Sequence, residues 1–171
     1  IYLFNSSIRD NICMYKDIIY LFNSSIRDNI CMYKDIDDKF IMEACKDSGL
    51  ADFISGVSLD YVVGQNGAML SGGQKQKIAL ARALVHNSPV IIFDEATSNT
   101  DVYSEHQING LLHTKLKEKT VIIITHKQEI LKEADQIIML KDGAVVGSGV
   151  YDDLSKDNLE FKNMLNMGEK Y

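Results

Sequence analysis

Several residue types are scarce or absent in this 171-residue chain, and each absence argues against a class of protein. The chain has no tryptophan, one proline and three cysteines, none of them in a Cys-x-x-Cys pair. We therefore expect neither a disulfide framework nor a zinc framework, and we expect the protein to reside in a reducing compartment. Apolar runs such as 121–124 are far shorter than the roughly 20 residues of a membrane-spanning helix. The net charge of -6 argues against a surface that coats nucleic acid.

What remains is an ordinary composition for a globular domain, with 46% hydrophobic and 25% charged residues. A chain of this length can bury one sizeable core, or a core with a small appended subdomain. It begins at Ile1 rather than at a methionine and shows no secretory signal. We therefore expect a piece of a longer protein.

The first 36 residues consist of one 18-residue segment, IYLFNSSIRDNICMYKDI, written twice. Repeats that build solenoids have periods of about 20 to 50 residues, and their units diverge in sequence. A recent tandem duplication or an assembly artefact explains perfect identity better. Because the second copy runs directly into the rest of the chain, we expect 19–36 to hold the native position. Residues 1–18 are then an added extension.

The hydrophobic pattern changes along the chain from helical to alternating strands and helices. Helices are expected over 37–48, 51–54, 71–86, 102–117, 128–133 and 158–166, and strands over 90–93, 120–124, 136–140 and 144–146. In the first helix the apolar residues fall on one face, namely Phe40, Ile41, Ala44 and Cys45. The expected organisation is a helical region over 19–86 and an α/β region over 87–171.

The sequence Leu70-Ser71-Gly72-Gly73-Gln74 opens one of these helices. Serine is a favourable N-cap, and glycine lets the backbone approach a ligand closely. The unpaired N–H groups and partial positive charge of a helix start favour an anion such as phosphate. An ordinary capped helix has the same pattern, so this motif alone leaves both interpretations open.

Two expected strands end in polar side chains that suit catalysis. Asp94 and Glu95 follow the strand over 90–93, and His126 follows the strand over 120–124. The carboxyl ends of such strands form the edge where α/β sheets bind ligands. One carboxylate there suits Mg²⁺, a second can deprotonate water, and a histidine can contact a γ-phosphate. The alternatives are acids that merely begin a loop and a structural histidine.

In order and spacing, these motifs resemble those of the ATP-binding cassette (ABC) ATPases. Residues 70–74 resemble the signature motif, 90–95 the Walker B strand with its catalytic glutamate, 98–101 the D-loop that contains Asp101, and His126 the switch histidine. Further similarity to the exporter subtype lies in 21–30, 63–67 and 142–154, although Gln65 stands where many relatives carry glutamate. The resemblance covers 19–166 and is to bacterial peptide, bacteriocin or multidrug exporters.

The chain also departs from the family pattern. It contains no Gly-Lys dipeptide and so no Walker A loop, and Lys16-Asp17-Ile18 stands where a Q-loop glutamine would precede the second copy. The fold that the resemblance implies is therefore α/β and P-loop NTPase-like. It is a partial RecA-like sheet with an α-helical subdomain, without the Walker A strand and loop.

The resemblance implies an ATP-binding and ATP-hydrolysing domain that powers an exporter, with ATP and Mg²⁺ as cofactors. Glu95 would be the general base, Asp94 would bind Mg²⁺ and His126 would contact the γ-phosphate. In the family, ATP lies between two domains that face each other head to tail. The signature motif and the D-loop would face the ATP that a partner domain holds. The signature residues are Ser71, Gly72, Gly73 and Gln74, and the D-loop residue is Asp101.

The implied partners are a second nucleotide-binding domain and transmembrane domains that contact 37–67, with no nucleic acid. The implied location is the cytoplasmic face of the plasma membrane, or the cytosol for the isolated chain. Two alternatives stay open. The isolated chain could be a non-catalytic docking fragment, or it could belong to a DNA-repair ATPase, although it lacks the long coiled-coil heptads of that class.

Overall fold

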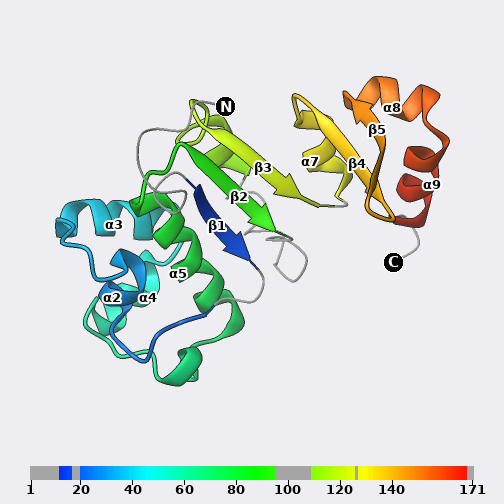
Figure 1. Cartoon of the computed structure of the whole chain (residues 1–171). Coiled ribbons are helices and arrows are strands. Elements are labelled where there is room, and N and C mark those ends of the chain that lie inside the picture. The colour runs from blue at the N-terminus through cyan, green and yellow to red at the C-terminus, as the bar shows by residue number, and fades with distance from the viewer. Residues whose placement is uncertain (1–11, 17–19, 95–108, 126, 169–171) are drawn as a thin grey trace. The chain divides into compact units, whose positions relative to one another are not determined.

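The computed structural model describes residues 12–16, 20–94, 109–125 and 127–168. The chain divides into two compact units, Ile1–Ile124 and Thr125–Tyr171, and each is described by itself. Within its described residues, the first unit combines a helical region with a parallel sheet, and the second combines a β-hairpin with helices (Figure 1).

The helical region of the first unit is built around one apolar core. Its helices are α2 (Ile26–Cys31), α3 (Asp38–Asp47), α4 (Ala51–Val57) and α5 (Gly72–Val85), with the 3-10 turn η1 at Gln65–Gly67. Wholly buried members of the core include Ile26, Ile30, Ile41, Cys45 and Ile78. The helices expected over 37–48, 51–54 and 71–86 are confirmed, whereas α2 had no expected counterpart.

Local hydrogen bonds explain where α2 and α3 begin and end. Ser25 Oγ accepts a hydrogen bond from the Asp28 amide at 3.0 Å, and Asp37 Oδ1 accepts one from the Lys39 amide at 2.8 Å. Each of these side chains satisfies a backbone donor that a helix start leaves free. After α3 the chain turns at Gly49, whose φ of 70° is a left-handed value that favours glycine.

The expected apolar face of α3 is right for three residues and wrong for one. Ile41, Ala44 and Cys45 are buried, but Phe40 is 61% exposed. At 100° per residue, Phe40 lies about 90° from the centre of the face that the other three share. It therefore sits at the margin of the buried stripe and faces solvent.

The sheet of the first unit contains three described parallel strands, β1 (Ile12–Lys16), β2 (Val90–Asp94) and β3 (Thr120–Ile124), in the order β1-β2-β3. The register pairs Ile12 with Val90, and Val90 with Thr120. The expected strands over 90–93 and 120–124 are confirmed. A strand over 12–16 was not expected, and it comes from the first copy of the repeat.

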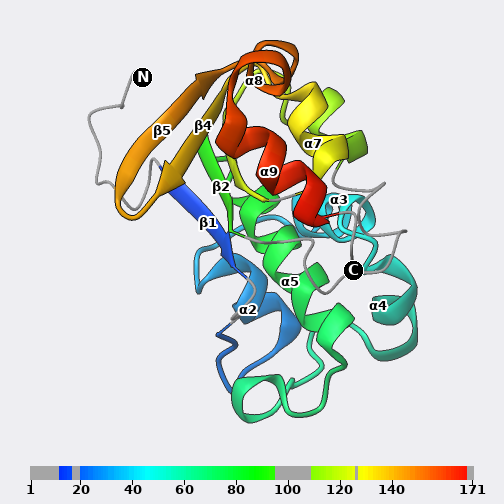
Figure 2. The same ribbon diagram turned by 90° about the vertical axis from the view of Figure 1, so that its right-hand side faces the viewer.

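Helix α5 connects the two parts of this unit. Ile78 and Ala81 belong to the core of the helical region, whereas Ala79 and Leu80 belong to a second core with Ile91 and others. Apolar residues all around the middle of a helix indicate that it is buried on more than one side. Figure 1 shows α5 running between the sheet and the helices α2, α3 and α4, and Figure 2 shows the same helices from the side.

The two expected strands of this sheet differ in burial. Ile91 and Phe93 of β2 are buried, as expected for a parallel strand covered on both faces. On β3, Ile122 and Ile124 are 44% and 49% exposed. Strand β2 lies between β1 and β3, whereas β3 is one of the two edge strands among the described strands of this sheet, which explains why it is less buried.

The second unit is built on an antiparallel hairpin. Its elements are α7 (Gln128–Glu133), β4 (Ile137–Lys141), β5 (Ala144–Gly149), α8 (Tyr151–Asp157) and α9 (Leu159–Gly168). Asp142 and Gly143 form the turn with φ values of 50° and 78°, which asparagine-like residues and glycine tolerate. The expected hairpin is confirmed, and α8 was not expected. Across the described residues, no helix combines the length and apolar character that a membrane span requires.

Candidate functional site

Ser71 is the N-cap of α5, as the sequence predicted. The Ser71 hydroxyl accepts a hydrogen bond from the Gln74 amide at 3.2 Å, and Gln74 Oε1 accepts one from the Ser71 amide at 2.8 Å. This reciprocal pair is a capping box. It fixes the start of the helix at Gly72 and holds the Ser71 and Gln74 side chains beside the first turn.

The start of α5 is open to solvent at its two glycines. Ser71, Gly72 and Gly73 are exposed, and a Cβ built on either glycine would meet no atom within 4 Å. The capping box satisfies the amide of Gln74, and within the described chain no acceptor pairs with the amides of Gly72 and Gly73. Two free N–H donors at the positive end of a 14-residue helix form a surface that an anion can approach closely.

The loop in front of α5 holds this surface in place. Lys75 Nζ donates to the Asn66 carbonyl oxygen at 3.0 Å, which ties the first turn of α5 to η1. Gly67 has a φ of 68°, and a Cβ there would lie 2.7 Å from Leu21 Cδ1. A glycine is therefore needed for both the backbone conformation and the close packing. The Met69 amide donates to the Val63 carbonyl at 3.1 Å and closes the loop.

The carboxyl ends of the parallel strands form the second part of the candidate site. Asp94 is half-buried at the last position of β2, in register with Lys16 of β1 and Ile124 of β3. The structure therefore places Asp94 at the edge of the sheet where ligands bind in α/β folds. The proposed catalytic residues Glu95 and His126 and the D-loop residue Asp101 lie outside the described residues.

Ser71 does not link the start of α5 to the strand end at Asp94. The polar side-chain partner of Ser71 is Gln74 of its own helix, and Asp94 ends a strand of the neighbouring sheet. Among the residues that the structure describes, no group of three or more His, Cys, Asp or Glu residues is arranged to hold a metal ion. Asp94 is thus one possible oxygen ligand rather than a complete metal centre.

Sequence reasoning missed the contribution of the first repeat copy to this edge. Strand β1 brings Lys16 to the register position level with Asp94. The signal was ambiguous, because the apolar run at 12–15 ends in the polar pair Lys16-Asp17, but the identical run at 30–33 forms no strand. The same pattern of an apolar strand with a polar end identified the strands over 90–93 and 120–124.

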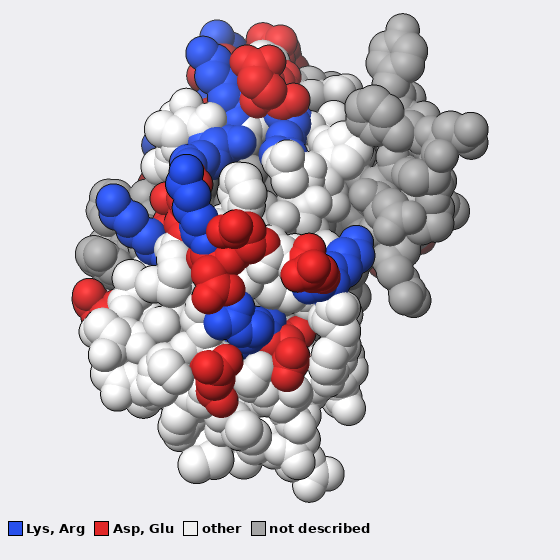
Figure 3. All heavy atoms as spheres, turned by 90° about the vertical axis from the view of Figure 1, so that its left-hand side faces the viewer, with Lys and Arg blue, Asp and Glu red and all other residues white. Residues whose placement is uncertain are grey.

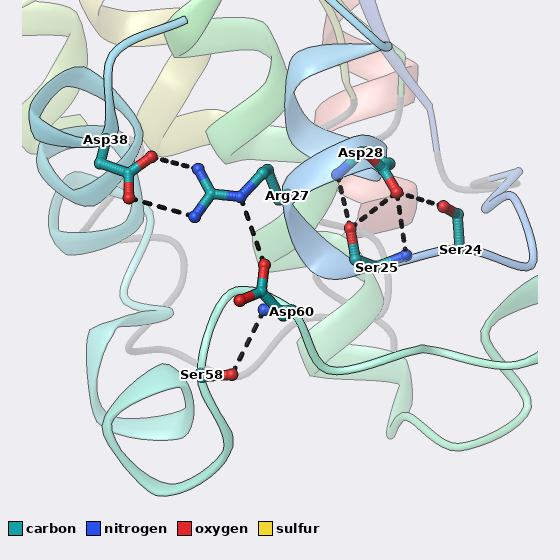
Figure 4. A network of polar contacts seen from close by, with 7 residues as sticks. All are labelled: Ser24, Ser25, Arg27, Asp28, Asp38, Ser58 and Asp60. Carbon is teal, nitrogen blue, oxygen red and sulfur yellow. Dashed lines mark hydrogen bonds and ion pairs between the residues drawn. The ribbon is translucent and has the colours of Figure 1, made fainter.

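The surface around α2 and α3 carries paired charges of both signs. Both Nη atoms of Arg27 bond the two carboxylate oxygens of Asp38, and Arg27 Nε donates to Asp60 Oδ1 at 3.4 Å (Figure 4). Hydrogen bonding from Arg27 lowers the pKa of Asp38. Figure 3 shows acidic and basic side chains interspersed on one face of the molecule. This alternation offers no uniformly basic surface on that face for nucleic acid.

Beside this network lies an open hollow of about 420 Å³, lined by Arg27, Asp28, Cys31, Tyr33, Lys34, Asp35, Ile36, Asp37 and Asp38. The hydroxyl of Ser24, and then that of Ser25, lowers the pKa of Asp28 by hydrogen bonding. The lining includes neither Ser71 nor Asp94, so the hollow is separate from the candidate site.

Comparison with known proteins decides the family. The family model described as "ABC transporter" matches residues 5–98, which is more than half of the chain. The chain belongs to the ABC transporter family. The matched region of this ABC-family chain contains β1, the helical region, α5 and β2. The resemblance drawn from the sequence motifs is thereby confirmed, and membership of the family implies ATP binding.

Curated relatives of the ABC-family chain are exporters. It is 46% identical over 157 residues to the toxin RTX-I translocation ATP-binding protein of Actinobacillus pleuropneumoniae, covering 91% of this chain and 20% of that protein. It is 38% identical over 169 residues to the ATP-dependent lipid A-core flippase of Alcanivorax borkumensis, covering 98% of this chain and 26% of that protein. The chain therefore spans between a fifth and about a quarter of the length of these relatives.

A solved structure gives the same result for the fold. A bacterial Atm1-family ABC exporter with ATP bound matches with a TM-score of 0.88 and 31% sequence identity. The match covers 95% of this chain and 29% of that chain. The predicted ABC ATPase fold is thus confirmed, and the chain corresponds to the ATP-binding domain of ABC exporters.

Proposed function

We propose that this chain contributes the signature-motif side of an ATP site that forms between two ABC ATPase domains facing head to tail. The observation that carries the proposal is the exposed, capped start of α5. Its amides at Gly72 and Gly73 are free of intramolecular acceptors from the described residues, and nothing crowds either glycine. Donors at a helix N-terminus suit the γ-phosphate of a nucleotide that the partner domain holds.

The residues of this chain can contact ATP from the signature-motif side of the site. A tight nucleotide site in such ATPases needs a cradle of backbone amides and a lysine in a glycine-rich loop. The given sequence contains no Gly-Lys dipeptide. The chain thus supplies donors toward a partner's phosphates, and we expect it to bind ATP only weakly by itself.

The strand-end residues complete the proposal for hydrolysis in the whole transporter. Asp94 would provide one oxygen ligand for Mg²⁺, whose role is to neutralise phosphate charge. Glu95 would accept a proton from water, His126 would contact the γ-phosphate, and Asp101 would lie in the D-loop at the domain interface. Within this proposal, export driven by ATP hydrolysis is the activity of the longer protein at the cytoplasmic face of the plasma membrane.

A second proposed contact is with transmembrane domains through 37–67. Two large apolar side chains of α3, Phe40 and Met42, are 61% and 41% exposed, and Val62 in the same segment is 52% exposed. Exposed apolar residues on a charged surface favour a protein partner. The same residues would serve the alternative in which the isolated chain only docks and does not take part in catalysis. The exporter relatives disfavour the DNA-repair alternative.

The test separates helix capping from phosphate binding by two substitutions at one position. Ser71→Asp keeps a good N-cap but places a negative charge where the phosphate would lie, whereas Ser71→Ala loses the cap. A partner ABC ATPase domain with an intact Gly-Lys loop is titrated with a fluorescent ATP analogue, with and without this chain. We expect the chain to tighten the analogue's affinity for the partner about tenfold, equivalent to about 1.4 kcal/mol.

Ser71→Asp should abolish that gain, and Ser71→Ala should reduce it. Gly56→Ala is the matched control, since this exposed glycine of α4 also has open space around it. The proposal is wrong if the chain leaves the partner's affinity unchanged, or if Ser71→Asp performs as well as the native chain. Micromolar affinity of the chain alone for the analogue would contradict its one-sided role.

A further inference from the structure

Arg82, in the last turns of α5, fastens the segment over 20–29 to the helix that carries the signature motif. Its Nε donates a hydrogen bond to the Asn29 carbonyl oxygen at 2.7 Å. Its two Nη atoms each donate to the Tyr20 carbonyl oxygen at 3.4 Å. A guanidinium is a planar fork with five donors, so one residue can hold two carbonyl oxygens in fixed directions. One side chain of α5 therefore binds the backbone at both ends of this segment.

The same segment pairs with the loop that leads to the signature motif. Ser25 forms an antiparallel bridge with Val62. The Val63 amide donates a hydrogen bond to the Ser24 carbonyl oxygen at 3.0 Å. The segment over 20–29 is thus bonded both to α5 and to the loop in front of α5.

A buried leucine of this segment supports the turn from which α5 begins. Leu21 is 1% exposed, and its Cδ1 lies so close to Gly67 that a Cβ there would approach it to 2.7 Å. The Gly67 carbonyl oxygen accepts a hydrogen bond from the Leu70 amide at 3.0 Å, and Leu70 directly precedes the N-cap Ser71. Because Leu21 follows Tyr20 in the chain, contacts run without a break from the guanidinium to the signature motif.

A second route from the guanidinium to the same leucine passes through Asn29. The carbonyl of Asn29 lies in the last turn of α2, where a helix leaves carbonyls without intrahelical partners. The side chain of Asn29 accepts from the Phe22 amide at 2.8 Å and donates to the Phe22 carbonyl at 3.1 Å. Phe22 is the other chain neighbour of Leu21. Loss of the guanidinium would therefore loosen the backbone on both sides of Leu21.

We propose that Arg82 is a positioning residue for the candidate phosphate surface at the start of α5. It holds the segment over 20–29 against α5, which keeps Leu21 against Gly67 and fixes the turn that aims the exposed amides. Arg82 does not touch phosphate, because eleven helical residues place it about 16 Å along the axis from the N-cap. Its effect on ATP rests on the proposed function, whereas its effect on the loop does not depend on nucleotide.

Three variants of the full chain test this role. Arg82→Gln removes the guanidinium, and Arg82→Lys keeps the charge without the fork. Arg27→Gln is the matched control, since Arg27 is also a half-buried guanidinium of the helical region but bonds the carboxylates of Asp38 and Asp60. Hydrogen exchange of the Met69 and Leu70 amides is measured without nucleotide. The affinity gain for the partner's ATP analogue is measured in the titration described above.

We expect Arg82→Gln to exchange about tenfold faster at Met69 and Leu70, with the sheet amides over 91–94 unchanged. Its affinity gain should fall from about tenfold to less than about threefold. Arg82→Lys should lie between this variant and the native chain, and Arg27→Gln should match the native chain in both measurements. If Arg82→Gln also exposes 91–94, the fold as a whole is weakened and the decision is taken on Arg82→Lys.

Unchanged exchange at Met69 and Leu70, or an equal increase in the Arg27→Gln control, would overturn the positioning role. Faster exchange with an undiminished affinity gain would overturn it as well. A native chain that gives no affinity gain would instead contradict the proposed function. The exchange measurement would then still decide whether Arg82 holds the loop.

Discussion

The Asn29 side chain is a buried polar group whose removal has a cost that can be worked out bond by bond. It is fully buried. Its Oδ1 accepts from the Phe22 amide at 2.8 Å, and its Nδ2 donates to the carbonyl oxygens of Phe22 at 3.1 Å and Ser25 at 2.9 Å. Asn29 therefore joins the segment before α2 to the body of the helix.

Asn29→Ala leaves only one of these three groups without a partner. The Phe22 carbonyl also accepts from the Ser24 amide at 2.8 Å, and the Ser25 carbonyl also accepts from the Asn29 amide at 3.1 Å. The Phe22 amide alone is orphaned, at a cost of about 1–3 kcal/mol. The small cavity adds roughly 1 kcal/mol. We therefore expect Asn29→Ala to lower the free energy of unfolding by about 2–4 kcal/mol.

Asn29→Asp separates hydrogen bonding from volume. The introduced carboxylate can still accept the hydrogen bond from the Phe22 backbone N–H. Its second oxygen, however, replaces the Nδ2 donor and faces the carbonyl oxygens of Phe22 and Ser25. Burial and this repulsion should raise the pKa of the introduced carboxyl above the usual value near 4. The folded variant then binds more protons than the unfolded one, so its stability relative to the native chain falls as pH rises above about 4.

Urea denaturation followed by circular dichroism at pH 4 to 8 measures both variants under reducing conditions. The control is Asn23→Ala, because Asn23 is exposed in the same segment and should change stability by no more than about 0.5 kcal/mol. An Asn29→Asp variant as stable as the native chain at pH 7 would refute the assigned hydrogen bonds. They would also be refuted if Asn29→Ala lowered the free energy of unfolding no more than Asn23→Ala does.

Two further predictions concern a glycine turn and an ion pair. Gly67→Ala should destabilise the chain by about 2 kcal/mol or more, because φ is 68° and the new Cβ would lie 2.7 Å from Leu21. At Gly143, φ is also positive but the new Cβ would meet open space, so Gly143→Ala should lower the free energy of unfolding by only about 1 kcal/mol. Equal decreases in the thermal unfolding temperature for the two variants would contradict the packing argument. Arg27 lowers the pKa of Asp38, so the pair's stabilisation is present above about pH 4 and is lost as pH falls through the lowered pKa. In urea titrations, the stability gap between the native chain and Arg27→Gln should therefore narrow below about pH 4, and a gap independent of pH would contradict this.

Much of the helical region could be predicted from the sequence because its signals are local. The caps at Asp37 and Ser71 and the stop at Gly49 mark helix ends through contacts within a few residues. The motifs at 70–74 and 90–95 identified the family for the same reason, since each depends on short spacing. Burial of Phe40 was predicted wrongly because a side chain at the margin of a helical face is decided by its neighbours in space.

The functional roles of all the predicted site residues stay predictions, namely Ser71, Gly72, Gly73, Gln74, Asp94, Glu95, Asp101 and His126. The division at residue 87 and the extension over 1–18 also stay predictions. The strand β1 could not be predicted from its five residues alone, because in the second copy the same sequence forms the last two residues of α2 and a left-handed turn. Exposure of Ile122 and Ile124 likewise depends on which strand lies at the sheet edge. Both outcomes depend on pairing between segments that are far apart in sequence.

The sequence by itself determined the ABC family, the capped start of α5 and most element boundaries, because these depend on residue types at short spacing. Only the tertiary structure decided that ICMYK forms a strand in the first copy of the repeat and a helix end with a left-handed turn in the second. The physical reason is that backbone pairing with β2 and burial against the helical core are both nonlocal. For two identical segments, these contacts are the only difference between the available conformations.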